Sequence, residues 1–150
     1  MKLKNKTGSR LQVLRSGIQG FGVFAKCPIK KGEMIIEYVG ELISADLEDK
    51  REALYDSLDL GCYMFRIPDE EETIDATMKG NMARFINHSC DPNAKTDHIV
   101  VEDQKKIIIY AIRDIYPGEE IAYNYMFAID DEDKVPCYCG AKNCKGYMNV

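Results

Sequence analysis

Short apolar segments alternate with turn residues along most of the chain, and this pattern predicts a mostly β domain. Branched and aromatic residues dominate these segments, while residues typical of turns, such as those of Lys30–Glu33 and Pro117-Gly118, separate them. Two pairs of segments read as hairpins, one across an acidic loop and one across 102–105. The predicted strands are Leu11–Leu14, Gly22–Ala25, Met34–Tyr38, Cys62–Ile67, Thr73–Ala76, Ile99–Val101, Lys106–Tyr110 and Glu120–Tyr123.

One segment between the third and fourth predicted strands has helical periodicity instead. Its apolar residues fall on one stripe, a serine stands at the N-cap position, and acidic residues suit the positive end of a helix. These residues are Leu47, Leu54 and Leu58 on the stripe, Ser44 at the cap, and Asp46 and Glu48 in the first turn. The pattern ends near Gly61, and a shorter helix is predicted for 80–85. The fold class is therefore mostly β with few short helices (α+β).

The length and apolar pattern indicate one domain outside any membrane. A chain of 150 residues buries enough surface for one core, and it shows no internal repeat or Pro/Gly/Ser linker. The longest apolar run, 107–112, is too short to span a bilayer. No apolar stretch follows the charged start, so we expect no secretory signal.

The net charge of −5 bears on the class of partner. Acidic runs at 69–72 and 130–133 replace the basic face that nucleic-acid binders carry, so direct nucleic-acid binding is disfavoured. A basic peptide partner is compatible with this charge, which would speed its encounter with the chain. Solvated loops that confer solubility are the alternative interpretation of both runs.

Six cysteines without an export signal fit a reducing compartment, where thiolates bind metal more readily than they pair. Three of them, Cys137, Cys139 and Cys144, crowd into eight residues, with Gly140 supplying a tight turn. A tetrahedral zinc site needs a fourth ligand. Cys27 and Cys62 lie in apolar strand patterns, where thiols act as small hydrophobes, whereas Cys90 follows a polar loop. The spacing favours a metal, with unpaired or disulfide-bonded cysteines as the alternative.

Other candidate residues give weaker signals by themselves. The glycine-rich Gly17-x-x-Gly20-x-Gly22 lacks the third glycine of a dinucleotide fingerprint and the Lys-Ser/Thr of a phosphate loop. It predicts either a backbone that a ligand approaches closely or a β-turn. Tyr123 and Tyr125 alternate on a strand, so their rings are expected on one side, in a core or at a half-wet surface.

Four motifs in one order carry a resemblance to a known family. They are Gly20-Phe-Gly22-Val-Phe, Glu37-Tyr38-Val-Gly40, Asn87-His88-Ser-Cys90-x-Pro-Asn93 and Gly118-Glu-Glu-Ile-x-Tyr-x-Tyr125. Together they resemble the SET-domain family of protein lysine methyltransferases, from about Leu11 to Asn149. Within the family, 61–67 and 75–81 look most like the trithorax-like group, which acts on lysine 4 of histone H3.

The resemblance implies a fold of small β sheets with a pseudoknot and a C-terminal post-SET zinc segment. It implies an N-terminal extension at 1–10, a SET catalytic domain at 11–128 and the zinc segment at 129–150. One structural Zn²⁺ would be held by Cys90, Cys137, Cys139 and Cys144. The residues expected to bind S-adenosyl-L-methionine are Gln19, Gly20, Phe21, Gly22, Tyr63, Asn87, His88 and Tyr138.

The resemblance also implies an activity. Tyr125 matches the family's catalytic tyrosine, and Tyr123 the position that sets how many methyl groups are added. Tyr38, Tyr63 and Tyr123 would line a channel for the substrate lysine. The departures from the family pattern are Asn124, Ala122, Gln19 and Phe21.

We therefore expect methyl transfer from S-adenosyl-L-methionine to a histone H3 tail, with lysine 4 favoured and monomethylation as the main outcome. The expected location is the nucleus, reached by delivery if the chain is a microbial or viral effector, and activating subunits are possible partners. Neither nucleic-acid nor membrane binding is expected. The alternatives are a methyltransferase for a non-histone protein and a catalytically degenerate module that only binds peptide.

Overall fold

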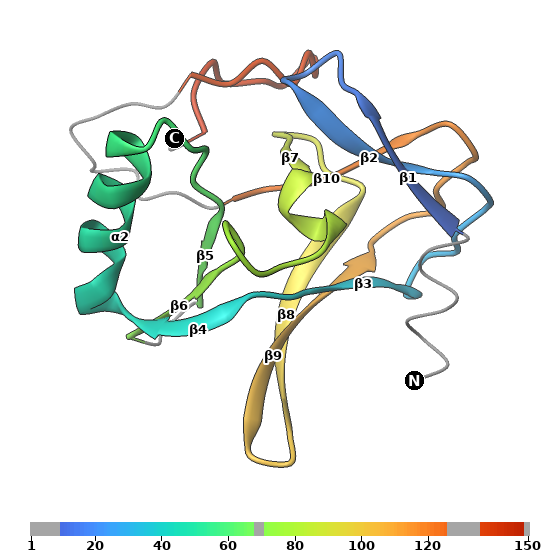
Figure 1. Ribbon diagram of the computed structural model, residues 1–150. Coiled ribbons are helices and arrows are strands. Elements are labelled where there is room, and N and C mark those ends of the chain that lie inside the picture. The colour runs from blue at the N-terminus through green and yellow to red at the C-terminus, as the bar shows by residue number, and fades with distance from the viewer. Residues whose placement is uncertain (1–9, 68–70, 126–135, 149–150) are drawn as a thin grey trace. The chain divides into compact units, whose positions relative to one another are not determined.

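The structure is a computed structural model that describes residues 10–67, 71–125 and 136–148. These residues form short strands, one α-helix and one 3₁₀ helix (Figure 1). The strands are β1 (Leu11–Arg15), β2 (Phe21–Ala25), β3 (Met34–Tyr38), β4 (Glu41–Ser44), β5 (Met64–Arg66), β6 (Glu72–Asp75), β7 (Asn87–His88), β8 (Ala94–Val101), β9 (Gln104–Ala111) and β10 (Glu120–Tyr123). The helices are α2 (Ala45–Ser57) and η1 (Met82–Phe85).

Three small sheets make up this fold. Their strand orders are β1-β2-β10-β7, β3-β9-β8 and β4-β6-β5. Strand content far exceeds helix content, so the predicted mostly β fold class is confirmed. Among the described residues, no helix is long and apolar enough to cross a membrane.

The described residues divide into two compact units. The first draws on the described parts of Met1–Ile36, Phe85–Asp97 and Ile109–Val150. The second draws on those of Glu37–Arg84 and His98–Ile108. Each unit thus combines segments that lie far apart in the sequence.

The four-stranded sheet belongs to the first unit and positions most of the predicted site. Strand β2 pairs antiparallel with β1 and with β10, and β10 pairs parallel with the two-residue β7 (Figure 1). The parallel register places Ala122 beside Asn87 and Tyr123 beside His88. Branched side chains fill the core of this unit, where Val23 and Ile121 are fully buried.

A polar network ties helix α2 to its neighbouring strands in the second unit. Strand β6 pairs antiparallel with both β4 and β5. At the end of β6, Asp75 is buried and accepts hydrogen bonds from the Tyr55 hydroxyl at 2.6 Å and from Arg51 Nη1 at 3.0 Å. Arg51 also bonds to Glu41 at 2.6 Å. The network satisfies the buried carboxylate, which an apolar interior would otherwise disfavour.

The helix prediction is correct, but the reason for its packing differs. Helix α2 follows Ser44, which stands at the N-cap without a side-chain capping hydrogen bond. The stripe of Leu47, Leu54 and Leu58 is exposed, and Tyr55 is the buried residue of the helix. Tyrosine packs inward here because its hydroxyl finds a partner in Asp75.

Most predicted strands are present, and the differences are local. Both hairpins are found, the second with Glu102 and Asp103 at positive φ in its turn. The two-residue β7 and the strand β4 were not predicted. Cys62 precedes β5 and is exposed, and Cys27 follows β2 and is half-buried, so placing their thiols in strand interiors was wrong. The acidic run 130–133 and residues 69–70 lie outside the described residues.

The side chain of Asn93 forms three hydrogen bonds with residues in and next to β10. This buried amide donates to the Glu120 carbonyl at 2.8 Å and to a Glu119 carboxylate oxygen at 2.7 Å. Its own oxygen accepts the Ala122 N–H at 2.9 Å. Three groups around β10 therefore depend on one side chain.

Replacing Asn93 by alanine is expected to lower the free energy of unfolding by about 2–4 kcal/mol, because buried polar groups lose their partners. Urea unfolding followed by circular dichroism measures the change. The control is Lys95→Ala, at an exposed position two residues along the chain on β8, and it should stay within about 0.5 kcal/mol of the parent. Equal stability of the two variants would contradict this account of β10.

Candidate active site and zinc centre

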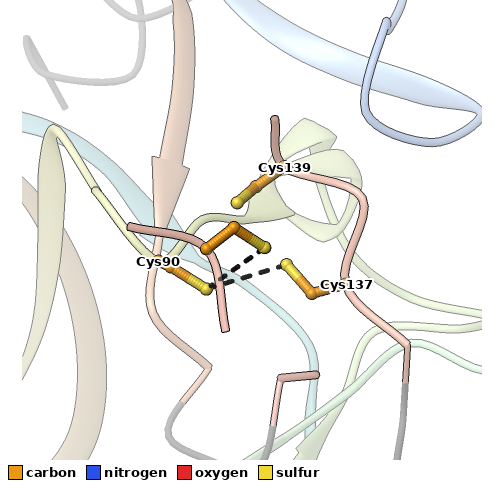
Figure 2. A group of neighbouring side chains, drawn as sticks. Cys90, Cys137 and Cys139 are labelled. Atoms are coloured by element: carbon orange, nitrogen blue, oxygen red, sulfur yellow. Dashed lines mark hydrogen bonds between the residues drawn. The ribbon is translucent and has the colours of Figure 1, made fainter. Parts of the chain in front are cut away.

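Four cysteines converge in the first unit from two distant parts of the chain. Cys90 follows β7, and the other three lie in the described C-terminal segment 136–148. All four sulfur atoms lie within 4.8 Å of one another. Figure 2 shows the labelled side chains of Cys90, Cys137 and Cys139 directing their sulfurs toward a shared centre. The structure therefore brings together all four cysteines that the resemblance implied.

The geometry of this cluster fits a tetrahedral Zn²⁺ site. The Cys90 sulfur lies 3.8 Å from that of Cys137 and 3.9 Å from that of Cys144. Four thiolates at the usual zinc–sulfur distance of about 2.3 Å are separated by about 3.8 Å. Disulfide-bonded sulfurs lie only about 2.05 Å apart, so Cys90 is bonded to neither of these two, and all four cysteines of the cluster are free thiols. Burial raises the pKa of the Cys137 thiol to about 12, which a bound cation would offset.

Turns in the C-terminal segment direct the sulfurs inward. Gly140 and Gly146 adopt positive φ angles of 74° and 86°, which glycine accepts without steric cost. The Cys137 N–H donates to the Gly146 carbonyl at 2.9 Å, and Pro136 bridges to Tyr147. Of residues 136–148 only Cys137 is buried, so a metal is the natural centre for this segment.

Asn87 connects β7 to the glycine-rich loop, which we name the cofactor loop (residues 16–22). Its side-chain N–H₂ group donates to the carbonyls of Gln19 at 3.2 Å and Phe21 at 3.0 Å. It also donates to the Glu120 carboxylate at 2.9 Å. The predicted cofactor residues Gln19, Gly20, Phe21, Gly22 and Asn87 are thus neighbours. Glu120 belongs to a motif noted in the sequence, but its contacts with this loop had no sequence signal.

The imidazole of His88 faces the interior instead of solvent. Its side chain is 1% exposed, and its Nδ1 accepts the Tyr125 N–H at 3.0 Å. Burial lowers the pKa of His88, which favours the neutral ring that this bond requires. With Nδ1 as acceptor, the proton of the neutral ring lies on Nε2, 3.7 Å from the Cys90 sulfur.

The two candidate tyrosines lie together at the end of β10. Tyr123 is buried at the last position of the strand, and the centroids of the Tyr123 and Tyr125 rings are 5.0 Å apart. The Tyr125 hydroxyl donates to the Ile86 carbonyl at 2.5 Å. A phenol whose hydrogen is engaged in this way still offers oxygen lone pairs to a donor. Tyr125 is thus fixed at its backbone by His88 and at its hydroxyl by Ile86.

Two aromatic residues of the predicted cofactor site are largely exposed to solvent. Phe21 is 53% exposed and packs edge-on against Phe85, with centroids 6.4 Å apart. Tyr138, between two cysteines of the cluster, is 64% exposed. Exposed rings offer flat apolar surface to a ligand.

Two of the predicted channel residues, Tyr38 and Tyr63, belong to the second unit. Tyr38 is buried against Phe65, with ring centroids 5.4 Å apart. The Arg84 guanidinium lies 6.0 Å from the Tyr63 ring centroid, a cation–π distance. Next to Tyr38, a side chain on Gly40 would approach the Asp75 carbonyl to 2.7 Å, so this motif requires glycine.

Comparison with known proteins decides the family. The SET domain family model matches residues 20–126, which include the cofactor loop from Gly20, β7 and the tyrosines. The chain belongs to the SET-domain family. This confirms the resemblance carried by the four sequence motifs.

Characterised relatives of this SET-domain chain extend the comparison. It is 51% identical over 148 residues to histone-lysine N-methyltransferase 2B of Homo sapiens, covering 98% of this chain and 5% of that protein. It is 50% identical over 147 residues to histone-lysine N-methyltransferase trithorax of Drosophila virilis, covering 98% of this chain and 4% of the relative. An H3 lysine-4 specific enzyme of Eremothecium gossypii is 50% identical over 138 residues, 90% of this chain and 14% of that protein. The chain therefore spans only a small part of these relatives.

A solved structure matches this SET domain as well. The crystal structure of KRYPTONITE in complex with mCHG DNA and SAH superimposes with a TM-score of 0.75 at 32% identity. The match covers 92% of this chain and 28% of that one. Together with the strand content, it confirms the SET-domain fold.

The cysteine cluster predicts one zinc ion per chain. Cys144→Ser should weaken zinc binding by more than about 100-fold, because a tetrahedral site loses one of its four ligands. Metal content by mass spectrometry and competition with a chromogenic chelator measure this change. Cys62→Ser, a change at an exposed cysteine outside the cluster, is the matched control and should keep full zinc content. Equal zinc affinity in both variants would rule out the four-cysteine site.

Proposed function

We propose that the chain is a protein lysine N-methyltransferase that uses S-adenosyl-L-methionine. The observation that carries the proposal is the doubly anchored Tyr125, whose backbone bonds to His88 and whose hydroxyl bonds to the Ile86 carbonyl. Membership of the SET-domain family and the methyltransferase names of the relatives support it. KRYPTONITE, solved with SAH, supports the choice of cofactor.

In this proposal the cofactor lies against the cofactor loop and β7. Backbone groups of residues 19–22, the main chain of His88 and the side chain of Asn87 form the contact surface in the first unit. Phe21 and Tyr138 offer exposed rings for an adenosine. Tyr63 is assigned to the amino-acid end of the cofactor from the family resemblance alone.

When bound, S-adenosyl-L-methionine supplies an electrophilic methyl group. The chain has to deliver a neutral lysine amine in line with that methyl. Tyr125 orients the amine: its hydroxyl donates its hydrogen to the Ile86 carbonyl, and the hydroxyl oxygen can then accept an N–H of the lysine amine. The family resemblance assigns Tyr38, Tyr63 and Tyr123 to the walls of the lysine channel, where a weakly polar environment would disfavour the ammonium form and promote loss of its proton.

One Zn²⁺ held by Cys90, Cys137, Cys139 and Cys144 has a structural role in this proposal. The four sulfur atoms lie within 4.8 Å of one another, and four thiolates would fill every position of a tetrahedral ion, as in structural sites. The ion would fix the segment that carries Tyr138. We accordingly assign 1–10 to an N-terminal extension, 11–128 to catalysis and 129–150 to zinc binding.

The proposed substrate is the tail of histone H3, with lysine 4 favoured, and the proposed location is the nucleus. The printed names of relatives, among them an H3 lysine-4 specific enzyme, support this choice. The net charge of −5 suits a basic tail and disfavours direct DNA binding. If the chain is a microbial or viral effector, we propose that it is delivered to the nucleus. Activating subunits are the other proposed class of partner.

Tyr125→Phe is expected to lower methyl transfer by roughly 100-fold or more, because the group that orients the amine is lost. Transfer of labelled methyl groups to core histones measures the activity, and binding of S-adenosylhomocysteine should persist in the variant. Tyr116→Phe, at an exposed tyrosine outside the site, is the control. Label on other proteins but on no histone would favour a non-histone substrate. Peptide binding without any methyl transfer by the parent chain would identify a degenerate module.

Tyr123→Phe is expected to shift the product from monomethyl-lysine toward di- and trimethyl-lysine. Tyr123 is buried beside Tyr125, so removing its hydroxyl enlarges the space around the amine. Mass spectrometry of an H3 peptide containing lysine 4 measures the product distribution. A distribution unchanged from the parent would remove Tyr123 from this role.

A further inference from the structure

Glu120, the first residue of β10, directs its carboxylate at the cofactor loop. Both of its oxygens accept the Ser16 hydroxyl, at 2.7 and 2.9 Å. The oxygen at 2.9 Å from Ser16 also accepts the Asn87 side-chain N–H₂ at 2.9 Å. One half-buried carboxylate thus bonds to residues from two segments remote in sequence.

Those two partners in turn hold the backbone of the cofactor loop. The Ser16 hydroxyl accepts the Ile18 N–H at 2.9 Å, and the Ser16 N–H donates to the Gly20 carbonyl at 2.8 Å. Asn87 donates to the carbonyls of Gln19 and Phe21. The loop is therefore fixed from its first residue by Ser16 and from its far end by Asn87, and Glu120 orients both.

The Glu120 carboxylate occupies the space that a side chain at position 22 would need. A Cβ atom on Gly22 would collide with the Glu120 carboxylate, reaching its Cδ at 2.8 Å. Gly22 is not at positive φ, unlike Gly20, so its requirement for glycine comes from space and not from backbone conformation. Any side chain at position 22 would displace the carboxylate from Ser16 and Asn87.

We infer that Glu120 is a positioning residue that locks the cofactor loop in its binding conformation, and that position 22 is glycine to make room for its carboxylate. The inference rests on the proposed function for the identity of the ligand. A carboxylate only accepts hydrogen bonds, so it orients the Ser16 O–H and the Asn87 N–H at once. A loop ordered before binding loses less conformational freedom when the ligand arrives.

The decisive variant is Glu120→Gln, which keeps the size of the side chain but removes its negative charge and replaces one of its two acceptor oxygens by an N–H₂ donor, so Ser16 and Asn87 can no longer both bond to a carboxylate. Hydrogen exchange at the Ser16, Ile18 and Gln19 amides should become faster in the cofactor-free protein. The dissociation constant for S-adenosylhomocysteine should rise roughly tenfold, the scale of one charge-assisted hydrogen bond. The KM for S-adenosyl-L-methionine should rise with kcat nearly unchanged, while zinc content stays at the parent's value.

Glu119→Gln is the matched control, because this adjacent carboxylate bonds to Arg113 and Asn93 and not to the cofactor loop. It should leave loop exchange unchanged. Ser16→Ala should loosen the loop as Glu120→Gln does, and the double variant should be no worse than either alone. If Glu120→Gln does not fold, Ser16→Ala provides the same measurement of loop exchange.

Unchanged exchange in the cofactor loop of Glu120→Gln and Ser16→Ala would overturn the inference. So would an equal effect of Glu119→Gln, because the loss would then be general destabilisation. A parent chain that binds no S-adenosylhomocysteine would overturn the proposed function instead. Because loop exchange is measured without cofactor, the two failures are distinguishable.

Discussion

Two parallel backbone pairs, Asn87 with Ala122 and His88 with Tyr123, join segments that lie 35 residues apart in the sequence. The candidate site depends on this short contact between β7 and β10. It sets Asn87 against the cofactor loop, His88 against the Tyr125 backbone and Ile86 against the Tyr125 hydroxyl. Asn93 supports the same strand from its other side by bonding around Glu120 and Ala122. A parallel contact of two residues has little stability of its own, so these side-chain bonds are needed to maintain it.

The proposed zinc centre and the proposed catalytic residue Tyr125 depend on one segment of chain. Between Ile86 and Cys90, successive residues bond to Tyr125, hold the cofactor loop and supply a metal ligand. The ring of His88 contacts both neighbours, accepting the Tyr125 N–H at Nδ1 and lying 3.7 Å from the Cys90 sulfur at Nε2. A structural ion of this kind acts on catalysis by geometry, because no open coordination position is left for substrate.

Glycine and carboxylate residues give the cofactor loop its shape before any ligand binds. Gly20 provides a positive φ angle, and Gly22 provides the volume that the Glu120 carboxylate fills. The second unit uses a comparable arrangement, in which Gly40 leaves room for the Asp75 backbone while the Asp75 side chain holds Arg51 and Tyr55. In both units a buried or half-buried acid is satisfied by hydrogen bonds from segments distant in sequence, which fixes the loops beside it.

The sequence by itself determined most of the strands, the hairpin across 102–105, the presence of the helix after Ser44 and the cluster of Cys137, Cys139 and Cys144, because each leaves a signal within a few neighbouring residues. Motifs in a fixed order also identified the family. Tertiary structure alone decided that β7 exists, since a two-residue strand has no periodicity and forms only beside β10. It decided that Tyr55 and not the leucine stripe packs inward, because the partner of its hydroxyl is on β6. The tertiary structure also brought Ser16 and Asn87 within hydrogen-bond distance of Glu120. Spacing along a chain reports local conformation, whereas a hydrogen bond between residues 104 positions apart, such as Ser16 with Glu120, depends on how the whole unit folds.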